Sequence, residues 1–136
     1  MTKQPDSTSV YLPNKAMNEL TRLARATRPL CDNHPGECGI LALDNSLDAF
    51  AARYRLAEMA ERTLDVQYYI WEDDMSGRLL FAVLLAAAKR GVHVRLLLDD
   101  NNTPGLDDTL QLLDAHPNIE VRLFNPFSFR ILRALG

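Results

Sequence analysis

The residues best suited to chemistry follow three apolar stretches of the chain. They are carboxylates, amides and aromatic side chains: Trp71, Glu72, Asp73 and Asp74 after the first stretch, Asp99, Asp100, Asn101 and Asn102 after the second, and Asn125 and Phe127 after the third. In an open parallel sheet, ligands bind beyond the carboxyl ends of the strands. We therefore expect a binding site where these clusters meet, although such residues also commonly cap turns and helices.

A second pattern concerns phosphate chemistry. His93, Arg95 and Asp100 have the spacing His-x-Arg-x-x-x-x-Asp, one substitution away from the His-x-Lys-x-x-x-x-Asp signature of the phospholipase D superfamily. Arginine is a planar fork and lysine a point charge, so the two do not interchange freely at a tight phosphoryl site. The alternating apolar residues from Val92 to Leu98 also fit an ordinary buried strand. We favour the buried strand over the motif.

A third candidate group contains sulfur ligands. Cys31, His34 and Cys38 lie in a segment whose Asn, Pro and Gly content predicts a loop. They could supply three ligands to zinc, but the spacing matches no common zinc finger. A disulfide is the alternative in an oxidising compartment, and two free thiols are the interpretation we favour.

The elements that position the first clusters form a βαβ unit. Residues 63–71 are rich in aromatic and β-branched side chains and predict a strand. Ser76 is a suitable N-cap for a helix that contains the apolar run from Leu79 to Ala88, and Gly91 is suited to end it. A second strand over residues 92–100 follows at once, and this order implies a parallel sheet.

The flanking segments extend this pattern. The expected elements are a helix over residues 44–62, capped by Asp44 or Asn45, with an apolar face of Leu47, Phe50, Ala51, Tyr54 and Ala57; a helix capped by Thr103 that carries Leu106, Leu110 and Leu113; and a strand over residues 119–124. The predicted fold class is α/β, a parallel-sheet βαβαβ core with flanking helices. The predicted domains are residues 1–29, a tail with a short amphipathic helix, and residues 30–136.

The two ends of the chain allow more than one interpretation. Residues 1–12 are polar and aperiodic, and residues 14–27 have the spacing of a weakly basic amphipathic helix, which could dock onto the protein or contact a membrane surface. Residues 124–136 are apolar, aromatic and basic. They fit either a segment that packs on a further part of the domain or a lipid-facing lip.

Composition narrows the function classes. The chain has 136 residues, of which 47% are hydrophobic and 24% charged, and a net charge of −3. This charge gives no general attraction to nucleic acid, and we expect no nucleic-acid partner. The longest apolar run has ten residues, about half of what a bilayer-spanning helix needs. No secretory signal is recognisable at the N-terminus.

Long segments of the chain resemble a known family. They are residues 64–71, 74–80, 91–101, 107–108 and 121–126. These segments resemble the N-terminal part of the bacterial cardiolipin synthases of the phospholipase D superfamily, with most likeness to their third type. The resemblance extends from about Leu30 to the end of the chain. Neither copy of the family's His-x-Lys-x-x-x-x-Asp motif is present, so the resemblance implies an N-terminal portion that is inactive alone.

The resemblance also implies a chemistry. In this family one motif histidine attacks the phosphorus of a phospholipid, another protonates the leaving alcohol, and lysines stabilise the phosphoryl charge without metal or cofactor. The implied partners are phospholipids, namely phosphatidylglycerol with phosphatidylethanolamine as a further substrate, and the membrane surface. The implied location is the bacterial cytoplasm or the inner membrane, peripherally. No catalytic residue is expected in this chain, and the expected substrate-binding residues are Tyr69, Trp71, Asp99, Asn101 and Asn125.

Two other functions fit the residues alone. One is a magnesium-dependent receiver-like phosphotransfer domain that uses Asp99 and Asp100 as a hard-cation site. The other is a small interaction module that binds through residues 127–135.

Overall fold

The computed structural model describes residues 21–126. It divides the chain into two compact units, Met1–Ile40 and Leu41–Gly136, which we describe separately. The predicted domain boundary after residue 29 stays a prediction. Three predicted features lie outside the described residues: the tail over residues 1–12, the first part of the helix predicted over residues 14–27, and the segment from Phe127 onwards.

The first unit contains helix α2, Arg22–Asn33. The side chain of Thr21 caps it by accepting from the backbone N–H of Ala24 at 3.1 Å. The helix continues through Pro29, so the predicted end at Thr27 and the predicted loop at Cys31 are wrong. An ion pair one turn apart, Arg28 to Asp32 at 3.6 Å, supports the extra turns.

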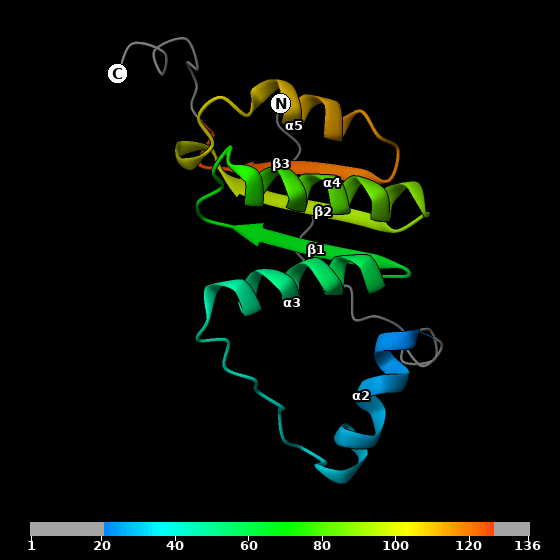
Figure 1. The fold of residues 1–136 in the computed structure, drawn as a ribbon. Coiled ribbons are helices and arrows are strands. Elements are labelled where there is room, and N and C mark those ends of the chain that lie inside the picture. Colours follow the sequence, from blue (N-terminus) through cyan, green and yellow to red (C-terminus); the bar gives the residue numbers. More distant parts are fainter. Residues whose placement is uncertain (1–20, 127–136) are drawn as a thin grey trace. The chain divides into compact units, whose positions relative to one another are not determined.

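The second unit is built on a three-stranded sheet with the order β1-β2-β3. Its strands are β1 (Thr63–Tyr68), β2 (His93–Asp99) and β3 (Ile119–Phe124), and both pairings are parallel. Parallel neighbours need crossover connections, and α4 (Met75–Lys89) and α5 (Asp107–Asp114) provide them (Figure 1). The α/β fold with a parallel sheet is therefore confirmed.

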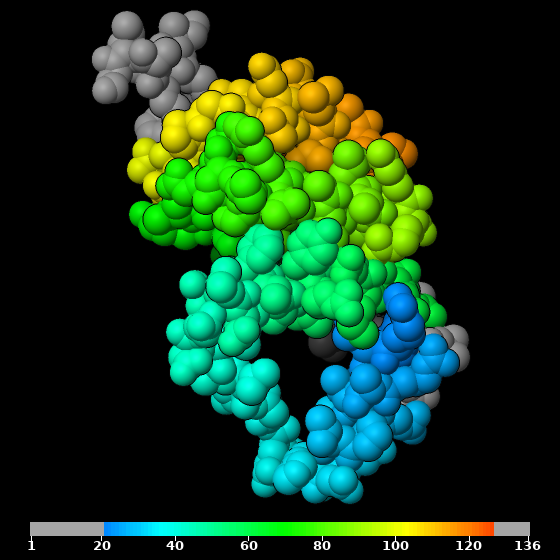
Figure 2. Space-filling view, viewed as in Figure 1, coloured from blue at the N-terminus to red at the C-terminus, as the bar shows by residue number. Residues whose placement is uncertain are grey.

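Helix α3, Ser46–Met59, precedes β1 and packs beside α4. Figure 2 shows the surfaces of these two helices meeting. Asn45 caps α3, as predicted, by accepting from two backbone N–H groups of the first turn. The apolar face is narrower than expected: Phe50, Tyr54 and Ala57 pack against the core, whereas Leu47 is 76% exposed. Ala51, also predicted on that face, is exposed.

Two predicted helix caps are wrong. Asp74, not Ser76, caps α4, and its carboxylate accepts from the backbone N–H of Gly77 at 2.8 Å. Ser76 lies inside the helix and donates its hydroxyl to the same carboxylate. Thr103 does not cap α5, because it is buried and its hydroxyl donates to the carbonyl of Asp100 in the short 3-10 turn Asp100–Asn102.

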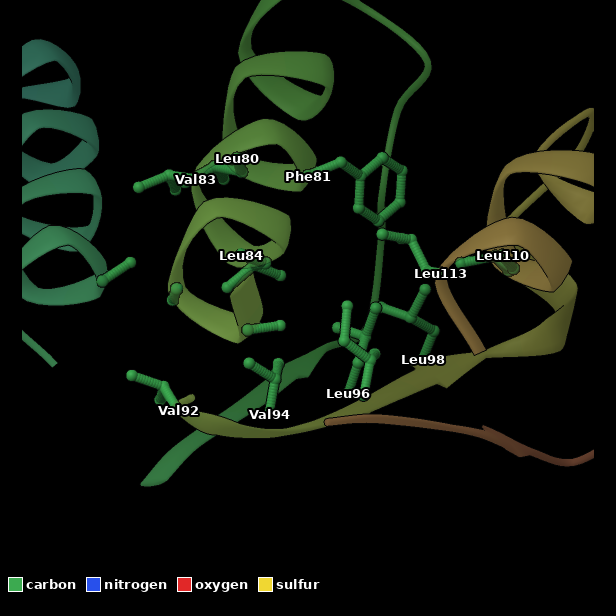
Figure 3. Packing of buried hydrophobic residues seen from close by; sticks show 14 of the residues in the cluster. Leu80, Phe81, Val83, Leu84, Val92, Val94, Leu96, Leu98, Leu110 and Leu113 are labelled. Atoms are coloured by element: carbon green, nitrogen blue, oxygen red, sulfur yellow. The ribbon is translucent and has the colours of Figure 1, made fainter. Parts of the chain in front are cut away.

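The core lies between the sheet and the helices. Val94, Leu96 and Leu98 of β2 are at most 2% exposed and point toward α4 and α5 (Figure 3). Ala87 and Ala88 of α4 are fully buried, and their small side chains allow a close approach of helix and sheet. The alternation predicted for β2 is confirmed, and burying such side chains is the main stabilising term of the fold.

The opposite sheet face is polar. Arg95 donates to both carboxylate oxygens of Asp65, and Arg122 pairs with Glu120. Three of these residues are exposed, and Glu120 is half-buried. Exposed ion pairs of this kind add little to stability. Within residues 21–126, no helix combines the length and the apolar content needed to cross a membrane.

Candidate functional site

The carboxyl ends of the three strands border one open cleft. Because β1, β2 and β3 run parallel, their last residues meet at the same edge of the sheet. The cleft has a volume of about 960 Å³ and is lined by Gln67, Tyr68, Tyr69, Leu97, Leu98, Asp99, Asn101, Phe124, Asn125 and Pro126. Four of the five predicted substrate-binding residues, Tyr69, Asp99, Asn101 and Asn125, are therefore brought together.

Asp99 lies at the end of the central strand β2 and holds the loop that lines the cleft there. Its side chain is 8% exposed, and Oδ1 accepts from the backbone N–H of Asn101 at 2.9 Å. This bond holds the backbone of the turn that follows β2, and Asn101 in that turn is exposed. Asp99 thus shapes the cleft as well as lining it.

Tyr69 and Asn125 form the outer walls. The Tyr69 side chain is 69% exposed. Asn125 has φ of +49°, in the left-handed region that asparagine tolerates better than most residues. It directly follows Phe124, which pairs with Asp99 across the sheet. These walls offer a phenol and amides, which donate to phosphoryl oxygens and both donate to and accept from hydroxyl groups.

The structure places Trp71 in the core, away from the cleft lining. Its side chain is 4% exposed. The indole stacks on Phe81 with ring centroids 4.3 Å apart and meets Tyr68 edge-on at 4.9 Å. The Trp71 backbone N–H also donates to the carbonyl of Asn102 at 3.3 Å. Trp71 therefore joins the loops after β1 and β2 behind the cleft wall.

The other carboxylates after β1 are engaged in local structure. Arg78 donates to Asp73 from two nitrogens, at 2.8 and 3.0 Å, and this contact lowers the pKa of the Asp73 carboxyl. The pKa of Asp74 is also lowered, chiefly by the backbone N–H of Gly77 and then by the hydroxyl of Ser76. Neither residue lines the cleft.

The near-motif of His93, Arg95 and Asp100 does not form a site. His93 begins β2, at the end of the strand away from the cleft. The Arg95 guanidinium is held by Asp65, and Asp100 is fully buried. This arrangement agrees with the prediction of an ordinary strand.

The described part of the chain has no metal-binding cluster. Residues 21–126 contain no group of three His, Cys, Asp or Glu side chains placed to hold a metal ion. Cys31 and Cys38 are exposed free thiols, and His34 Nδ1 lies 3.1 Å from a carboxylate oxygen of Glu37. Asp99 and Asp100, the residues of the receiver-like alternative, are both buried.

Several lining residues were not predicted from the sequence. Gln67 and Tyr68 are the last two residues of β1, and Leu97 and Leu98 directly precede Asp99, the last residue of β2. The rule that parallel strands end at one edge would have found them, because it applies to the strand ends as well as to the loops.

Comparison with known sequences decides the family. Cardiolipin synthase C of Escherichia coli is 80% identical over 117 residues, which are 86% of this chain and 25% of that protein. The chain belongs to the cardiolipin synthase family. Cardiolipin synthase B of E. coli is 36% identical over 69 residues, which cover 51% of the chain and 17% of that protein. The chain thus spans about a quarter or less of these relatives. No family model matches it.

Solved structures add a comparison of fold only. TrmBL2, an archaeal chromatin protein, superposes with a TM-score of 0.51 at 19% sequence identity, covering 84% of this chain and 44% of that chain. At this identity the similarity concerns the fold and not the function.

Proposed function

We propose that this cardiolipin synthase-like chain supplies the scaffold and one wall of the phospholipid site of a phosphatidyltransferase. The observation that carries the proposal is the cleft, in which Tyr69, Asn101 and Asn125 come from the ends of three parallel strands. The 80% identity to cardiolipin synthase C of E. coli gives the reaction class. The substrates proposed are phosphatidylglycerol and phosphatidylethanolamine, met at the inner membrane surface from the cytoplasm.

The cleft residues have separate roles in this proposal. The Tyr69 hydroxyl and the side-chain amides of Asn101 and Asn125 donate to the phosphoryl oxygens and bond the glycerol hydroxyls. Asp99 holds Asn101 in place through the 2.9 Å bond to its backbone. Trp71 acts behind the wall, because it packs against Tyr68, which lines the cleft.

The covalent steps use groups outside this chain. A histidine attacks phosphorus to form a phosphohistidine and releases the alcohol of the donor lipid, which a second histidine protonates. The hydroxyl of an acceptor phosphatidylglycerol then attacks phosphorus, gives its proton to the second histidine and releases the first histidine. This chain binds and orients the lipid headgroup during both steps.

The test is a chimeric protein in which this chain replaces the matching quarter of E. coli cardiolipin synthase C. We expect the chimera to form cardiolipin from phosphatidylglycerol vesicles and the chain alone to form none. Asn125→Gly keeps the left-handed backbone but removes the amide. We expect a loss of kcat/KM of roughly ten- to a hundredfold, since a hydrogen bond to a charged group contributes about 1.5–3 kcal/mol.

The control for this variant is Leu112→Ala, an exposed leucine of α5 that does not line the cleft. It should leave kcat/KM unchanged. Cardiolipin formation by the chain alone, or an Asn125→Gly chimera with full activity, would contradict the proposal.

A further inference from the structure

The carboxylate of Asp99 is a buried negative charge at the cleft. Its side chain is 8% exposed, and Oδ1 accepts from the backbone N–H of Asn101. Among residues 21–126, no arginine, lysine or histidine forms an ion pair with Asp99. Carboxylates buried to this degree are normally paired with a cation, because removing a charge from water is costly. Asp99 therefore points to a cation that the described residues do not supply.

The rest of the cleft lining is neutral. Apart from Asp99 it consists of aromatic, aliphatic and amide residues, and no lysine, arginine or histidine is among the described residues that line it. The amides can donate to phosphoryl oxygens. The one charge in the lining, however, attracts a positive group and repels a negative one.

Two exposed aromatic residues flank Asp99 at the ends of the neighbouring strands. Phe124 pairs with Asp99 in the parallel register of β2 and β3, and neighbouring strands lie about 4.8 Å apart. On the other side Tyr68 pairs with Leu98, and Tyr69 and Asp99 are the next residues of the chain after these two. Phe124 is 58% exposed and Tyr69 is 69% exposed. A carboxylate between aromatic residues suits an alkylammonium group, which is attracted by the charge and by the faces of the rings.

The lining favours an organic cation over a metal ion. A hard metal ion takes about six or more oxygen ligands, and residues 21–126 bring no group of three His, Cys, Asp or Glu side chains together. An ammonium group needs only a few acceptors for its N–H groups. One carboxylate with aromatic and amide neighbours is therefore sufficient for it.

We propose that Asp99 is a specificity-determining residue for the donor lipid, whose primary ammonium group its carboxylate binds between Tyr69 and Phe124. This inference rests on the proposed function, in which the cleft holds a phospholipid headgroup. In an ethanolamine headgroup a short ethylene chain joins the ammonium to the phosphoryl ester. The ammonium can therefore meet Asp99 while the phosphoryl oxygens meet the amides of Asn101 and Asn125, which line the same cleft.

The test compares two donor lipids in the chimera with E. coli cardiolipin synthase C. Phosphatidylethanolamine and phosphatidylpropanol have headgroups of nearly equal size, but only the first carries an ammonium group. Each is supplied with a labelled phosphatidyl group in vesicles of phosphatidylglycerol, and the labelled cardiolipin gives kcat/KM. The preference is the ratio of the two values. We expect Asp99→Asn to lower this ratio by about tenfold or more, since the ammonium loses a charged hydrogen-bond partner.

Two further variants separate the charge from the shape of the cleft. Asp99→Asn keeps an oxygen for the Asn101 N–H, so the turn after β2 is retained. The matched control is Asp108→Asn, which removes the same charge from an exposed residue of α5 outside the cleft lining and should leave the ratio unchanged. Phe124→Leu removes one ring and should lower the ratio about two- to fivefold, the size of one exposed cation–π contact. An unchanged ratio in that variant would contradict the role of the ring.

Three outcomes would overturn the inference on Asp99 and leave the proposed function intact. The first is a chimera that uses both donor lipids equally, and the second is an unchanged ratio in Asp99→Asn. The third is an equal fall of kcat/KM for both lipids in that variant, because Asp99 would then pair with a cation of the protein itself. A chimera that forms no cardiolipin from phosphatidylglycerol alone would instead overturn the proposed function, and this inference with it.

Discussion

The two edge strands of the sheet, β1 and β3, differ in what covers their outward backbone groups. At β3, the Asp114 carboxylate of α5 accepts from the outward N–H of Val121, so a side chain of the connecting helix occupies the edge. At β1, the outward groups of Thr63, Asp65 and Gln67 have no such bond within the described residues, and an apolar groove lies alongside. A side chain that blocks an edge discourages pairing with another chain. Among the described residues, the outward N–H of Val121 at the β3 edge is thus covered by a side chain, and the outward backbone groups of β1 are not.

The loop that follows β1 is nevertheless tightly packed. Trp71 is buried between Tyr68 and Phe81, and Gly77 of α4 lies against it. The β1 side therefore combines a rigid carboxyl end with an open strand edge.

The largest loss of unfolding free energy is expected from Gly77→Ala, which disturbs that packing. A Cβ at this position would lie 2.1 Å from the carbonyl oxygen of Glu72 and 2.9 Å from Nε1 of Trp71. The neighbour at 2.1 Å is backbone, so the loop must shift, and overpacking of this kind costs about 3 kcal/mol. Urea denaturation of the chain should show the loss of unfolding free energy as a lower midpoint.

The control for this substitution is Gly39→Ala. A Cβ there meets no atom within 4 Å, so the free energy of unfolding should hardly change. If Gly77→Ala were equally neutral, the loop after β1 would not be the rigid part that the packing indicates.

A smaller loss of unfolding free energy is expected from Asp114→Ala, which uncovers the β3 edge. The substitution removes the acceptor for the Val121 N–H, and the loss of one hydrogen bond costs about 1 kcal/mol. Hydrogen exchange at Val121 should rise, and self-association measured by sedimentation should increase, because both edges are then open. Asp114→Asn keeps the oxygen and should change both much less; equal behaviour of the two variants would mean that the contact does not protect the edge.

Much of this contrast rests on features that local sequence can predict. The alternation in residues 92–98 gave β2 and its buried face, because a pleated strand has a period of two. The strand–helix–strand order of residues 63–100 implied a parallel pair, and parallel strands bring their loops to one edge. That is why Tyr69, Asn101 and Asn125 could be placed on one cleft without coordinates.

Other features depend on contacts between distant residues. Trp71 lies beyond the end of β1, where the pleat no longer sets the direction of a side chain, and its packing on Phe81 decides its place. Both Asp74 and Ser76 carry an oxygen that could cap α4, and the folded backbone brings the carboxylate of Asp74 to the N–H of Gly77. Which strand edge stays open was also beyond local pattern, because it depends on where α5 places Asp114.

The smallest effect is expected on the pH dependence of stability, at the start of α4, where the loop after β1 ends. The pKa of Asp74 is lowered from its ordinary value of 3.8 by the Gly77 N–H and the Ser76 hydroxyl. A carboxyl whose pKa is lower in the folded state stabilises the protein fully above its unfolded pKa, and this contribution is lost as pH falls through the folded pKa.

Asp74→Asn should therefore weaken the acid dependence of stability. Asparagine can still accept from the Gly77 N–H but does not titrate, so the variant should lose less unfolding free energy than the wild type between about pH 4 and lower pH. Urea midpoints at pH 7 and pH 3 measure this difference. Asp73, whose pKa Arg78 lowers, keeps part of the acid dependence in both proteins. An unchanged slope would mean that the cap does not couple protonation to the fold, and the rigidity of the β1 side would then rest on the packing of Trp71 and Gly77.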